Sequence, residues 1–582
     1  MTTKTQPQGK PVRTGAQCVM EGFQRAGVKT VFGLPGGAIL DVFAQLYSAP
    51  FEFILARHEQ GAAHMADGYA RATGKPGCLI VTSGPGATNT VTGLATAYMD
   101  GVPLVCVTGQ VHSAMIGNDA FQEADTVGIT RAVTKHNYLV REVDDLPRIM
   151  MEAFHIATTG KPGPVLIDIP KDVQRGTTAA EFPQEVKLRG YNPPREGHPK
   201  QIAKLAAAIN KARRPLLYVG GGAIAAEAAA ELTALARKAR IPVTTTLLGL
   251  GAFPETDPLA LRMLGMHGSV GANSAVSACD LLISVGARFD DRVTGKVSEF
   301  APHAVKAHID IDPSAIDKSV RTDIPVVGDA RQVLQALLEL VEPRERREWL
   351  AQVAEWNAKY PFTYNRQSEE LLPQYVIEQV YELTRGEAIV TTEVGQHQMW
   401  AAHFYKYTRP RTFLSSGGLG TMGYGLPAAI GAQAGRRDCL VVDIGGDGST
   451  QMNFQELVVA VEHELPIKVI ILNNAHLGMV RQWQEMFYDR RYSASVLKQS
   501  GRQPNEGIAG RRGYLPDFVK LAEAHGAVGL RVRHKAEVAP TLRRAFETAG
   551  PVVVECMVRE EENVYPMVPP GASLLEMIHS LA

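Results

Sequence analysis

The sequence contains no apolar run that approaches the roughly 18 residues a helix needs to cross a membrane. Its first 13 residues are polar and lack the apolar core of a secretory signal peptide. Charges of the two signs balance, with 60 Lys and Arg against 60 Asp and Glu. A chain without net charge has no overall electrostatic attraction to nucleic acid or to an anionic membrane. We therefore expect neither of them as a partner.

Cysteine is also scarce. The 582 residues include six cysteines, and no two of them have the CxxC spacing of a zinc site or a redox motif. Three of them, Cys78, Cys106 and Cys556, lie inside apolar runs that are typical of buried strands. This usage favours a reduced, cytoplasmic protein without structural zinc.

Short apolar runs alternate with helical patterns in three blocks, which predicts an α/β fold with three doubly wound parallel sheets. We expect domains at residues 11–185, 200–341 and 371–565, followed by a tail at residues 566–582. A linker rich in Pro, Arg and Gly occupies residues 191–199, and residues 499–514 are predicted to form a mobile loop. The predicted strands are residues 30–32, 51–56, 78–82, 104–108, 165–169, 216–219, 281–285, 307–311, 440–444, 467–472 and 551–558.

Two polar segments follow neighbouring predicted strands of the third block. Gly446-Asp447-Gly448 comes after residues 440–444, and Asn473-Asn474 comes after residues 467–472. Asn453 and Glu456 resemble a capping box that opens the helix between these strands. Asp447 and Asn474 would then lie beyond the carboxyl ends of both strands, where α/β sheets bind ligands. Their oxygens suit Mg²⁺. The alternative is a glycine turn with a capping Asp and an ordinary Asn-rich loop.

Glu59 follows the predicted strand that ends at Ala56, at the start of a helical pattern. Ala62, Ala63 and Ala66 are small and apolar, which suits close packing around a poorly solvated carboxyl group. Desolvation would raise the pKa of Glu59 and prepare it to share a proton. The alternative is a solvated acidic residue at a helix start. A metalloprotease site is excluded, because the next histidine, His64, is not at the HExxH spacing.

Three glycine-rich turns could bring the backbone close to a ligand. Gly33-Leu34-Pro35-Gly36-Gly37 and Ser83-Gly84-Pro85-Gly86 both follow predicted strands, and plain tight turns are the alternative for each. Gly418-Leu419-Gly420-Thr421-Met422-Gly423 matches GxGxxG, with Asp443 about twenty residues further on. This match is the basis for an alternative function as a nicotinamide-dependent dehydrogenase. The apolar run before it is short.

Together the Glu59, Asp447 and Asn474 segments resemble those of thiamine-diphosphate (ThDP) enzymes. The resemblance implies that Asp447, Asn474 and the carbonyl of His476 hold Mg²⁺, and that Glu59 hydrogen-bonds the aminopyrimidine ring. The ThDP-binding residues that it implies are Pro35, Glu59, Pro85, Asn89, Val394, Gly395, Gln396, His397, Gly420, Met422, Gly446, Asp447, Gly448 and Ser449. It also implies that Glu59 and Gly36 are catalytic, with Gly36 near the reacting centre.

Further motifs resemble one branch of that family, the biosynthetic acetohydroxyacid synthases. They are Phe121-Gln122-Glu123, Pro170-Lys171-Asp172, residues 264–268, residues 288–292 and residues 478–483. The resemblance implies decarboxylation of pyruvate and addition of the hydroxyethyl-ThDP enamine to a second 2-ketoacid. Pyruvate as acceptor gives 2-acetolactate, and 2-ketobutyrate gives 2-aceto-2-hydroxybutyrate. This is the first common step of branched-chain amino acid biosynthesis.

The same resemblance implies roles for five catalytic-site residues. Arg292 would bind the acceptor carboxylate, for which a guanidinium is well shaped, or it could simply pair with Asp290 or Asp291 at the surface. Trp483 would line the pocket for the additional methyl group of 2-ketobutyrate. The remaining three are Gln122 and Phe121 near the reacting centre and Lys171 at the access channel, with a core aromatic and a surface lysine as alternatives for Phe121 and Lys171.

FAD is implied as well, in the middle block. The implied contacts are Lys161, Gly220, Gly221, Gly222, Thr246, Leu247, Met266, His267, Gly286, Arg288, Asp310 and Asp329. Turn chemistry alone would also explain these residues. Lys161 stands where many relatives have Arg, and Glu393 stands where a smaller or shorter residue is common.

The resemblance also predicts the assembly. The cleft would join the first block of one subunit to the third block of another, so a homodimer or a dimer of dimers is expected, together with a regulatory small subunit. The closest alternative function is another pyruvate-handling ThDP enzyme, an oxidase or a decarboxylase.

Overall fold

The computed structural model describes residues 12–498 and 514–580. The first 11 residues and nearly all of the predicted loop at residues 499–514 lie outside this range. The chain divides into two compact units, Met1–Ala70 with Lys75–Asn192, and Arg71–Gly74 with Pro193–Ala582. In the part of the chain that is described, no helix combines the length and the apolarity that a membrane crossing requires.

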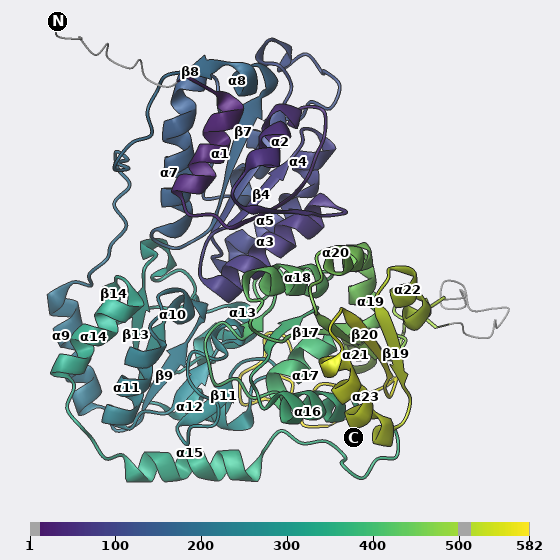
Figure 1. The fold of residues 1–582 in the computed structure, drawn as a ribbon. Helices are drawn as coiled ribbons and strands as arrows, with labels where there is room; N and C mark the ends of the chain where they lie inside the picture. The colour runs from purple at the N-terminus through teal and green to yellow at the C-terminus, as the bar shows by residue number, and fades with distance from the viewer. Residues whose placement is uncertain (1–11, 499–513, 581–582) are drawn as a thin grey trace, which may run out of the picture. The chain divides into compact units, whose positions relative to one another are not determined.

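The first unit is built on a six-stranded parallel sheet, of which Figure 1 labels β4 and β7. The strand order is β3-β2-β4-β5-β7-β6. Its strands are β2 (Thr30–Leu34), β3 (Glu52–Leu55), β4 (Gly77–Val81), β5 (Leu104–Gln110), β6 (His136–Leu139) and β7 (Pro164–Pro170), and a separate antiparallel pair is formed by β1 (Arg13–Thr14) and β8 (Thr177–Thr178). Its helices are α1 (Gly15–Arg25), α2 (Leu40–Gln45), α3 (Glu59–Thr73), α4 (Pro85–Asn89), α5 (Val91–Asp100), α6 (Thr126–Thr130), α7 (Leu146–Thr158) and α8 (Lys171–Arg175).

Every residue of β4, β5 and β7 is buried, as expected for central strands of a parallel sheet covered on both faces. On one face, Val19 and Phe23 of α1 and Met150 of α7 pack against the strands. On the other face α3 and α5 meet so closely that a side chain on Gly93 would overlap Ala63. All five predicted strands of this block are confirmed. Strand β6 was not predicted, because it is a partly exposed, polar edge strand.

The second unit begins with a central domain whose parallel sheet has the order β11-β10-β9-β12-β13-β14. In order of appearance along the chain this is 3-2-1-4-5-6, the arrangement of dinucleotide-binding folds. The strands are β9 (Pro215–Val219), β10 (Val243–Thr245), β11 (Ala260–Met263), β12 (Leu281–Val285), β13 (Val305–Asp310) and β14 (Ile324–Val327). The helices are α9 (Pro199–Lys211), α10 (Gly221–Ala225), α11 (Ala229–Ala239), α12 (Val270–Ala278), α13 (Asp291–Thr294) and α14 (Ala330–Leu340), followed by α15 (Arg347–Lys359).

Helices cover both faces of this sheet. Figure 1 shows α9, α11 and α14 together on one flank, where they share a core with Val219 and Val285. The opposite face packs against α12 and α15, through residues such as Val276 and Trp349. Three predicted strands are confirmed, whereas β10, β11 and β14 were not predicted. Strand β10 is three residues long, β11 contains Arg262, and edge strand β14 contains Pro325, so none has a clear apolar pattern.

The C-terminal domain has a third parallel sheet, ordered β16-β15-β17-β18-β20-β19. By order along the chain this is 2-1-3-4-6-5, and the sheet of the first unit has the same order. The strands are β15 (Ile389–Thr392), β16 (Phe413–Leu414), β17 (Val441–Gly446), β18 (Lys468–Asn473), β19 (Val528–Val532) and β20 (Val552–Met557). The helices are α16 (Pro373–Thr384), α17 (Gln396–Phe404), α18 (Gly425–Gly435), α19 (Asp447–Thr450), α20 (Leu457–Glu462), α21 (Gly478–Phe487), α22 (Phe518–Ala524) and α23 (Lys535–Glu547). The predicted fold class is confirmed in all three sheets.

The predicted capping box at Asn453 and Glu456 is wrong. Asn453 lies inside a 3₁₀ segment, Gln451–Glu456, with non-helical φ of −129°. Its side-chain amide donates to the carbonyl of Gly423 at 2.6 Å instead of receiving a helix N–H. Helix α20 then begins at Leu457 without a side-chain cap. A long-range hydrogen bond has replaced the local one that the sequence pattern indicated.

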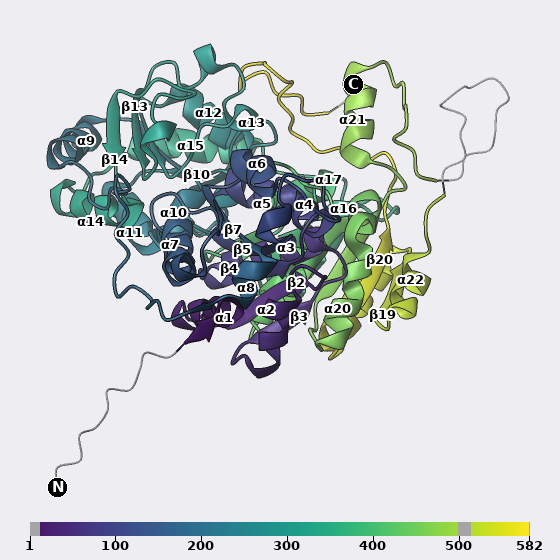
Figure 2. The same cartoon turned by 90° about the horizontal axis from the view of Figure 1, so that it is seen from above.

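The tail at residues 566–582 packs against the central domain over its described part. The N–H of Val568 donates to the carbonyl of Met266 at 2.8 Å, and the N–H of Lys296 donates to the carbonyl of Ala572 at 2.9 Å. Val568 and Leu574 join the core beneath α12 and α15. Figure 2 shows this segment in yellow, running to the region of α12 and α13. The tail is therefore part of the core of the second unit.

Leu574→Ala should destabilise the second unit by about 2–4 kcal/mol, because it leaves a cavity where a side chain with 2% exposure was packed. The free energy of unfolding from urea titration measures the effect. Leu575→Ala is the matched control, since its side chain is 58% exposed, and it should stay within about 0.5 kcal/mol of the parent. Equal effects of the two substitutions would contradict the packing of the tail.

Candidate active site

The first unit gathers its predicted cofactor residues at the carboxyl ends of β2 and β4, where the strand order reverses. Open α/β sheets bind ligands at such a point. Gly36 and Gly86 lie on either side of Thr82, and a Cβ on either glycine would come within about 2.6 Å of the Thr82 side chain. The hydroxyl groups of Thr82 and Ser83 are buried and have no hydrogen-bond partner among the described residues. The turns thus bring backbone and unpaired polar groups together at this edge.

Glu59 lies at the same edge and is the first residue of α3. Its side chain is 6% exposed, so the alternative of a solvated helix-start residue is wrong. The carboxylate accepts a hydrogen bond from the amide of Asn89 at 3.0 Å, and a Cβ on Gly86 would lie 3.4 Å from its other oxygen. Ala62, Ala63 and Ala66 are fully buried, as the pattern of small residues indicated.

The loop that carries Phe121 and Gln122 approaches this edge through its backbone. Gln122 adopts a positive φ of 59°, and a Cβ on Gly84 would come 2.7 Å from its carbonyl oxygen. Phe121 is 89% exposed, which rules out the core aromatic alternative. Glu123 folds back on the loop and accepts hydrogen bonds from the N–H groups of Gly117 and Ala120. Those backbone hydrogen bonds lower the pKa of Glu123.

Lys171 also faces these turns. It begins α8, directly after β7, and its ammonium group donates to the carbonyl of Gly37 at 3.0 Å. The side chain is therefore tied to the glycine turn that follows β2. Its predicted place beside the access route is not tested by this contact.

The corresponding edge of the C-terminal domain holds Asp447. This residue follows β17 and is 1% exposed, and one carboxylate oxygen accepts from the N–H of Gly448 at 3.0 Å. The other oxygen is buried and has no hydrogen-bond partner within the described residues. Burial raises the pKa of Asp447 to about 7, against the lowering effect of the Gly448 and Ala475 N–H groups. A buried carboxylate oxygen without a hydrogen-bond partner is a suitable ligand for a divalent cation.

Asn474 and His476 form a tight turn beside it, after β18. Strands β17 and β18 pair in parallel, with Gly446 opposite Leu472, so the predicted βαβ unit is confirmed. The side-chain oxygen of Asn474 accepts from the N–H of His476 at 3.1 Å. The imidazole of His476 lies 2.7 Å from the carbonyl of Asn474. One ring nitrogen of His476 is thus engaged locally, and the metal-binding role of its carbonyl stays a prediction.

His397 lies against the same strand end. Its ring would collide with a Cβ on Gly446 or on Gly395. Burial lowers the pKa of His397 to about 3, so the ring is neutral, and its Nε2 has no partner among the described residues. Gly395 and Val394 follow β15, which is adjacent to β17 in the sheet. Residues 394–397 and 446–449 therefore share one edge.

Gly420 and Met422 belong to the segment after β16. Gly420 has a φ of 71°, and Gly423 has a φ of 84°. The GxGxxG match thus follows a two-residue edge strand instead of the first strand of a dinucleotide-binding sheet. The glycine run that does follow such a first strand is Gly220-Gly221-Gly222, after β9. This placement weakens the dehydrogenase alternative.

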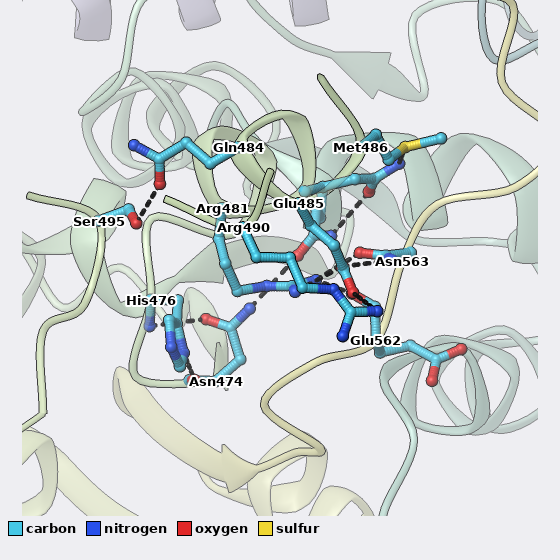
Figure 3. A network of polar contacts seen from close by, with 12 residues as sticks. Asn474, His476, Arg481, Gln484, Glu485, Met486, Arg490, Ser495, Glu562 and Asn563 are labelled. Atoms are coloured by element: carbon cyan, nitrogen blue, oxygen red, sulfur yellow. Dashed lines mark hydrogen bonds and ion pairs between the residues drawn. The ribbon is translucent and has the colours of Figure 1, made fainter. Parts of the chain in front are cut away.

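A buried polar network connects the turn at Asn474 and His476 to α21 (Figure 3). The amide of Asn474 donates to Gln396 at 3.3 Å, and Gln396 donates to Gln482 at 2.9 Å. Gln482 then exchanges two hydrogen bonds with the backbone of Val564, at 3.0 and 2.9 Å. The network connects a candidate metal ligand with the helix that carries Trp483.

Arg481 is the charged centre of the same network. Its side chain is 1% exposed, pairs with Glu485 at 2.8 Å and donates to Asn563, as Figure 3 shows. Asn563 in turn donates to Glu485 at 2.9 Å. Sequence patterns gave these three residues no role. A lone Arg in an amphipathic helix is ordinarily exposed, and Asn563 lies outside every motif.

Arg292 and Trp483 come together, as their predicted shared task requires. The guanidinium of Arg292 lies 5.8 Å from the Trp483 ring centroid. It also pairs with Asp291 at 3.0 Å, and its side chain is 59% exposed. The surface pair and the contact with Trp483 are therefore both present. Such a guanidinium is accessible to an incoming carboxylate.

The predicted FAD residues of the central domain follow its strand ends. Gly220 and Gly222 pack directly on Gly286, leaving no room for a Cβ. Asp310 ends β13 and accepts from the N–H of Asp312, and Asp329 caps α14. The others at or near this edge are Gly221, Thr246, Leu247, Met266, His267 and Arg288. A dinucleotide-type sheet with a glycine turn after its first strand fits a flavin nucleotide. Lys161 belongs to the first unit.

Three segments match domains of one family. Residues 13–129 match the thiamine pyrophosphate enzyme N-terminal TPP binding domain, residues 202–337 its central domain, and residues 393–556 its C-terminal TPP binding domain. The chain therefore belongs to the thiamine pyrophosphate enzyme family.

Within that family it is similar over nearly its whole length to acetolactate synthases. It is 46% identical to the acetolactate synthase isozyme 3 large subunit of Escherichia coli (strain K12), covering 97% of this chain and 98% of that one. The acetolactate synthase large subunit of Corynebacterium glutamicum is 48% identical, covering 98% of this chain and 90% of that one. The chloroplastic acetolactate synthase 3 of Brassica napus is 46% identical, over 97% and 87%.

Asp447→Asn should weaken Mg²⁺-dependent ThDP binding by on the order of 100-fold, because the amide removes the only anionic side chain of the proposed ligand set. Calorimetric titration of ThDP at several Mg²⁺ concentrations measures this. Asp438→Asn, at a side chain that is 68% exposed, is the control and should bind ThDP as the parent does. Unchanged binding by Asp447→Asn would remove Asp447 from the metal site.

Arg481→Met should cost about 3–5 kcal/mol of unfolding free energy, since it removes the buried cation that pairs with the buried Glu485 carboxylate. Arg490 contacts the same carboxylate at 3.8 Å, but its side chain is 70% exposed. Arg490→Met is therefore the matched control, with an expected change of less than about 0.5 kcal/mol. Urea titration compares the two, and similar losses would show that burial does not determine the strength of this network.

Proposed function

We propose that this chain is the catalytic subunit of an acetolactate synthase, which uses ThDP to decarboxylate pyruvate and join its two-carbon unit to a second 2-ketoacid. The observation that carries the proposal is the buried carboxylate of Asp447 beside Asn474, at the strand edge of a TPP-binding domain. One of its oxygens has no hydrogen-bond partner in the described part of the chain. Identity of 46–48% with acetolactate synthase subunits over nearly the full length supports the particular reaction.

The bound cofactor supplies the carbanion nucleophile and the electron sink for decarboxylation. Asp447, Asn474 and the carbonyl of His476 would hold Mg²⁺ and thereby fix the diphosphate. Glu59 would hold a proton at ring nitrogen N1′ of the cofactor. The hydrogen bond from Asn89 orients the Glu59 carboxylate, and burial keeps water from competing for it.

The acceptor ketoacid would be held by Arg292 and Trp483. A guanidinium binds a carboxylate through two parallel hydrogen bonds, and Arg292 would exchange Asp291 for the substrate. The Trp483 ring beside it offers an apolar wall for a methyl group. One additional methylene in such a pocket contributes about 1–3 kcal/mol of discrimination. This would let 2-ketobutyrate compete with pyruvate as acceptor. We also propose catalytic roles for Gln122, Phe121 and Lys171, on the support of the resemblance of their segments to those of acetohydroxyacid synthases.

FAD is proposed as a second cofactor, on the support of the central sheet's strand order and its glycine turn. The overall reaction involves no net oxidation, so FAD would have a structural task there.

A regulatory small subunit is also proposed, because the Escherichia coli and Corynebacterium glutamicum relatives are named large subunits. Pairing of two chains is proposed with it, supported by exposed apolar side chains of the first unit such as Met115 and Phe121.

Incubation of the chain with pyruvate, ThDP and Mg²⁺, with and without FAD, tests the proposal. We expect 2-acetolactate, and a mixed product when 2-ketobutyrate is added. Acetaldehyde, acetate or acetyl phosphate as the main product would replace the proposal with a decarboxylase or an oxidase. Binding of NAD(P) without any response to ThDP would support the dehydrogenase alternative.

Glu59→Gln should lower acetolactate formation by about 10²–10⁴-fold, since an amide cannot exchange the proton at the cofactor ring. ThDP and Mg²⁺ binding, measured by calorimetry, should persist because the diphosphate anchor is unchanged. Glu52→Gln on β3, a half-buried carboxyl of the same unit, is the control and should retain activity. Parent-like rates from Glu59→Gln would refute its role.

A further inference from the structure

Glu393 is a fully buried carboxyl group that the proposed chemistry does not use. It follows the last residue of β15 and has 0% exposure. One of its oxygens accepts from the N–H of Gly423 and from the hydroxyl of Ser449, each at 2.7 Å. The other accepts from the N–H of Leu426 at 3.0 Å. A carboxylate that accepts this many hydrogen bonds is fixed in position.

The partners of Glu393 come from two different cofactor segments. Gly423 follows Met422 and precedes α18, and Leu426 lies in the first turn of that helix. Ser449 lies in α19, two residues after Asp447. The N–H of Gly423 also donates to the hydroxyl of Ser449, at 3.2 Å. Through one side chain, the segment after β15 is joined to the segments after β16 and β17.

The space around Glu393 leaves little freedom for these segments to move independently. A Cβ on Gly425 would come 2.6 Å from the backbone nitrogen of Glu393 and would overlap Asp443. A Cβ on Gly445 would come 3.3 Å from the Glu393 side chain. Because these segments are so closely packed, a shift of one of them displaces the others.

Asp443 lies close to Glu393, and the two carboxyl groups influence one another. Burial and the nearby Glu393 raise the pKa of Asp443 well above its usual range. One Asp443 oxygen accepts from Thr391 at 2.9 Å. Glu393 accepts hydrogen bonds from three donors, which stabilise its ionised form. We therefore assign the negative charge to Glu393 and the proton to Asp443.

We propose that Glu393 is a positioning residue for ThDP: it sets the separation between the ring-side segment at residues 420–426 and the diphosphate-side segment at residues 446–449. It acts through Gly423 and Ser449 and does not itself touch the cofactor. The inference rests on the proposed use of ThDP by this chain.

Calorimetric titration of ThDP at saturating Mg²⁺ tests the assignment. Glu393→Gln keeps the shape but replaces one acceptor oxygen with an N–H₂ group, which must face either the N–H of Gly423 or the N–H of Leu426. The Kd for ThDP should therefore rise about 10–100-fold, the range expected when a hydrogen bond that supports a metal ligand is lost. Glu393→Asp keeps the charge but shortens the side chain by one methylene, so part of the affinity should return.

Lys468→Met is the matched control for a loss of buried hydrogen bonds in the same sheet. Lys468 is 1% exposed and donates to the carbonyls of Thr548 and Gly550, at the opposite end of β18 from the site. It should lower the melting temperature of the cofactor-free chain without changing the Kd for ThDP. A Glu393 variant with a merely structural defect would behave in the same way.

A Kd for Glu393→Gln within twofold of the parent value overturns the proposal. If that variant does not fold, Glu393→Asp decides: a Kd raised about threefold or more supports the proposal, and a smaller change overturns it. ThDP binding and 2-acetolactate formation by the parent chain show whether the positioning role or the proposed function itself has failed. A parent that binds ThDP and forms 2-acetolactate, with unaffected Glu393 variants, would refute the positioning role alone.

Discussion

The buried carboxylate of Asp447 is the constraint around which the C-terminal half of the site is organised. An ionised carboxyl group with one unpaired oxygen is costly to bury, and its pKa of about 7 expresses that cost. A divalent cation removes the cost by supplying the missing partner. The turn at Asn474 lies beside it, and Gly395 and Gly446 let the neutral ring of His397 pack directly against the backbone of the same edge.

Strand order explains why the half-sites occur where they do. The outer two sheets share the order 2-1-3-4-6-5. In each sheet the candidate ThDP-binding residues follow the first three strands, and in the C-terminal sheet Asn474 follows the fourth. The first and third strands in chain order are neighbours. Neighbouring connections leave in opposite directions there, so the carboxyl ends of these strands are not covered by a helix. The same topology thus presents Glu59 in the first unit and Asp447 in the second. The central sheet, with a different order, carries the residues proposed for FAD.

Buried polar groups hold the C-terminal half-site in one arrangement. Gln396 and Gln482 connect the Asn474 turn to α21, and Arg481 with Glu485 and Asn563 fixes that helix to the chain beyond β20. Glu393 joins the ring-side segment, through Gly423, to the diphosphate-side segment, through Ser449. Such networks are favourable only when their donors and acceptors are largely satisfied, so they specify position more than they add stability.

The sequence by itself determined the fold class, most of the central strands and the residues at their carboxyl ends, because continuous apolar runs and glycine turns are local signals. It did not reveal the interior strands β10 and β15. It also did not reveal edge strand β6, whose residues are partly exposed, or edge strand β14, which contains Pro325. Nor did it reveal the partners of Arg481 and Glu393, which lie far away along the chain. It also predicted a local cap at Asn453 where the side chain bonds Gly423. Tertiary structure decided these points, since a long-range hydrogen bond depends on which segments the sheet brings together, and local sequence does not encode that.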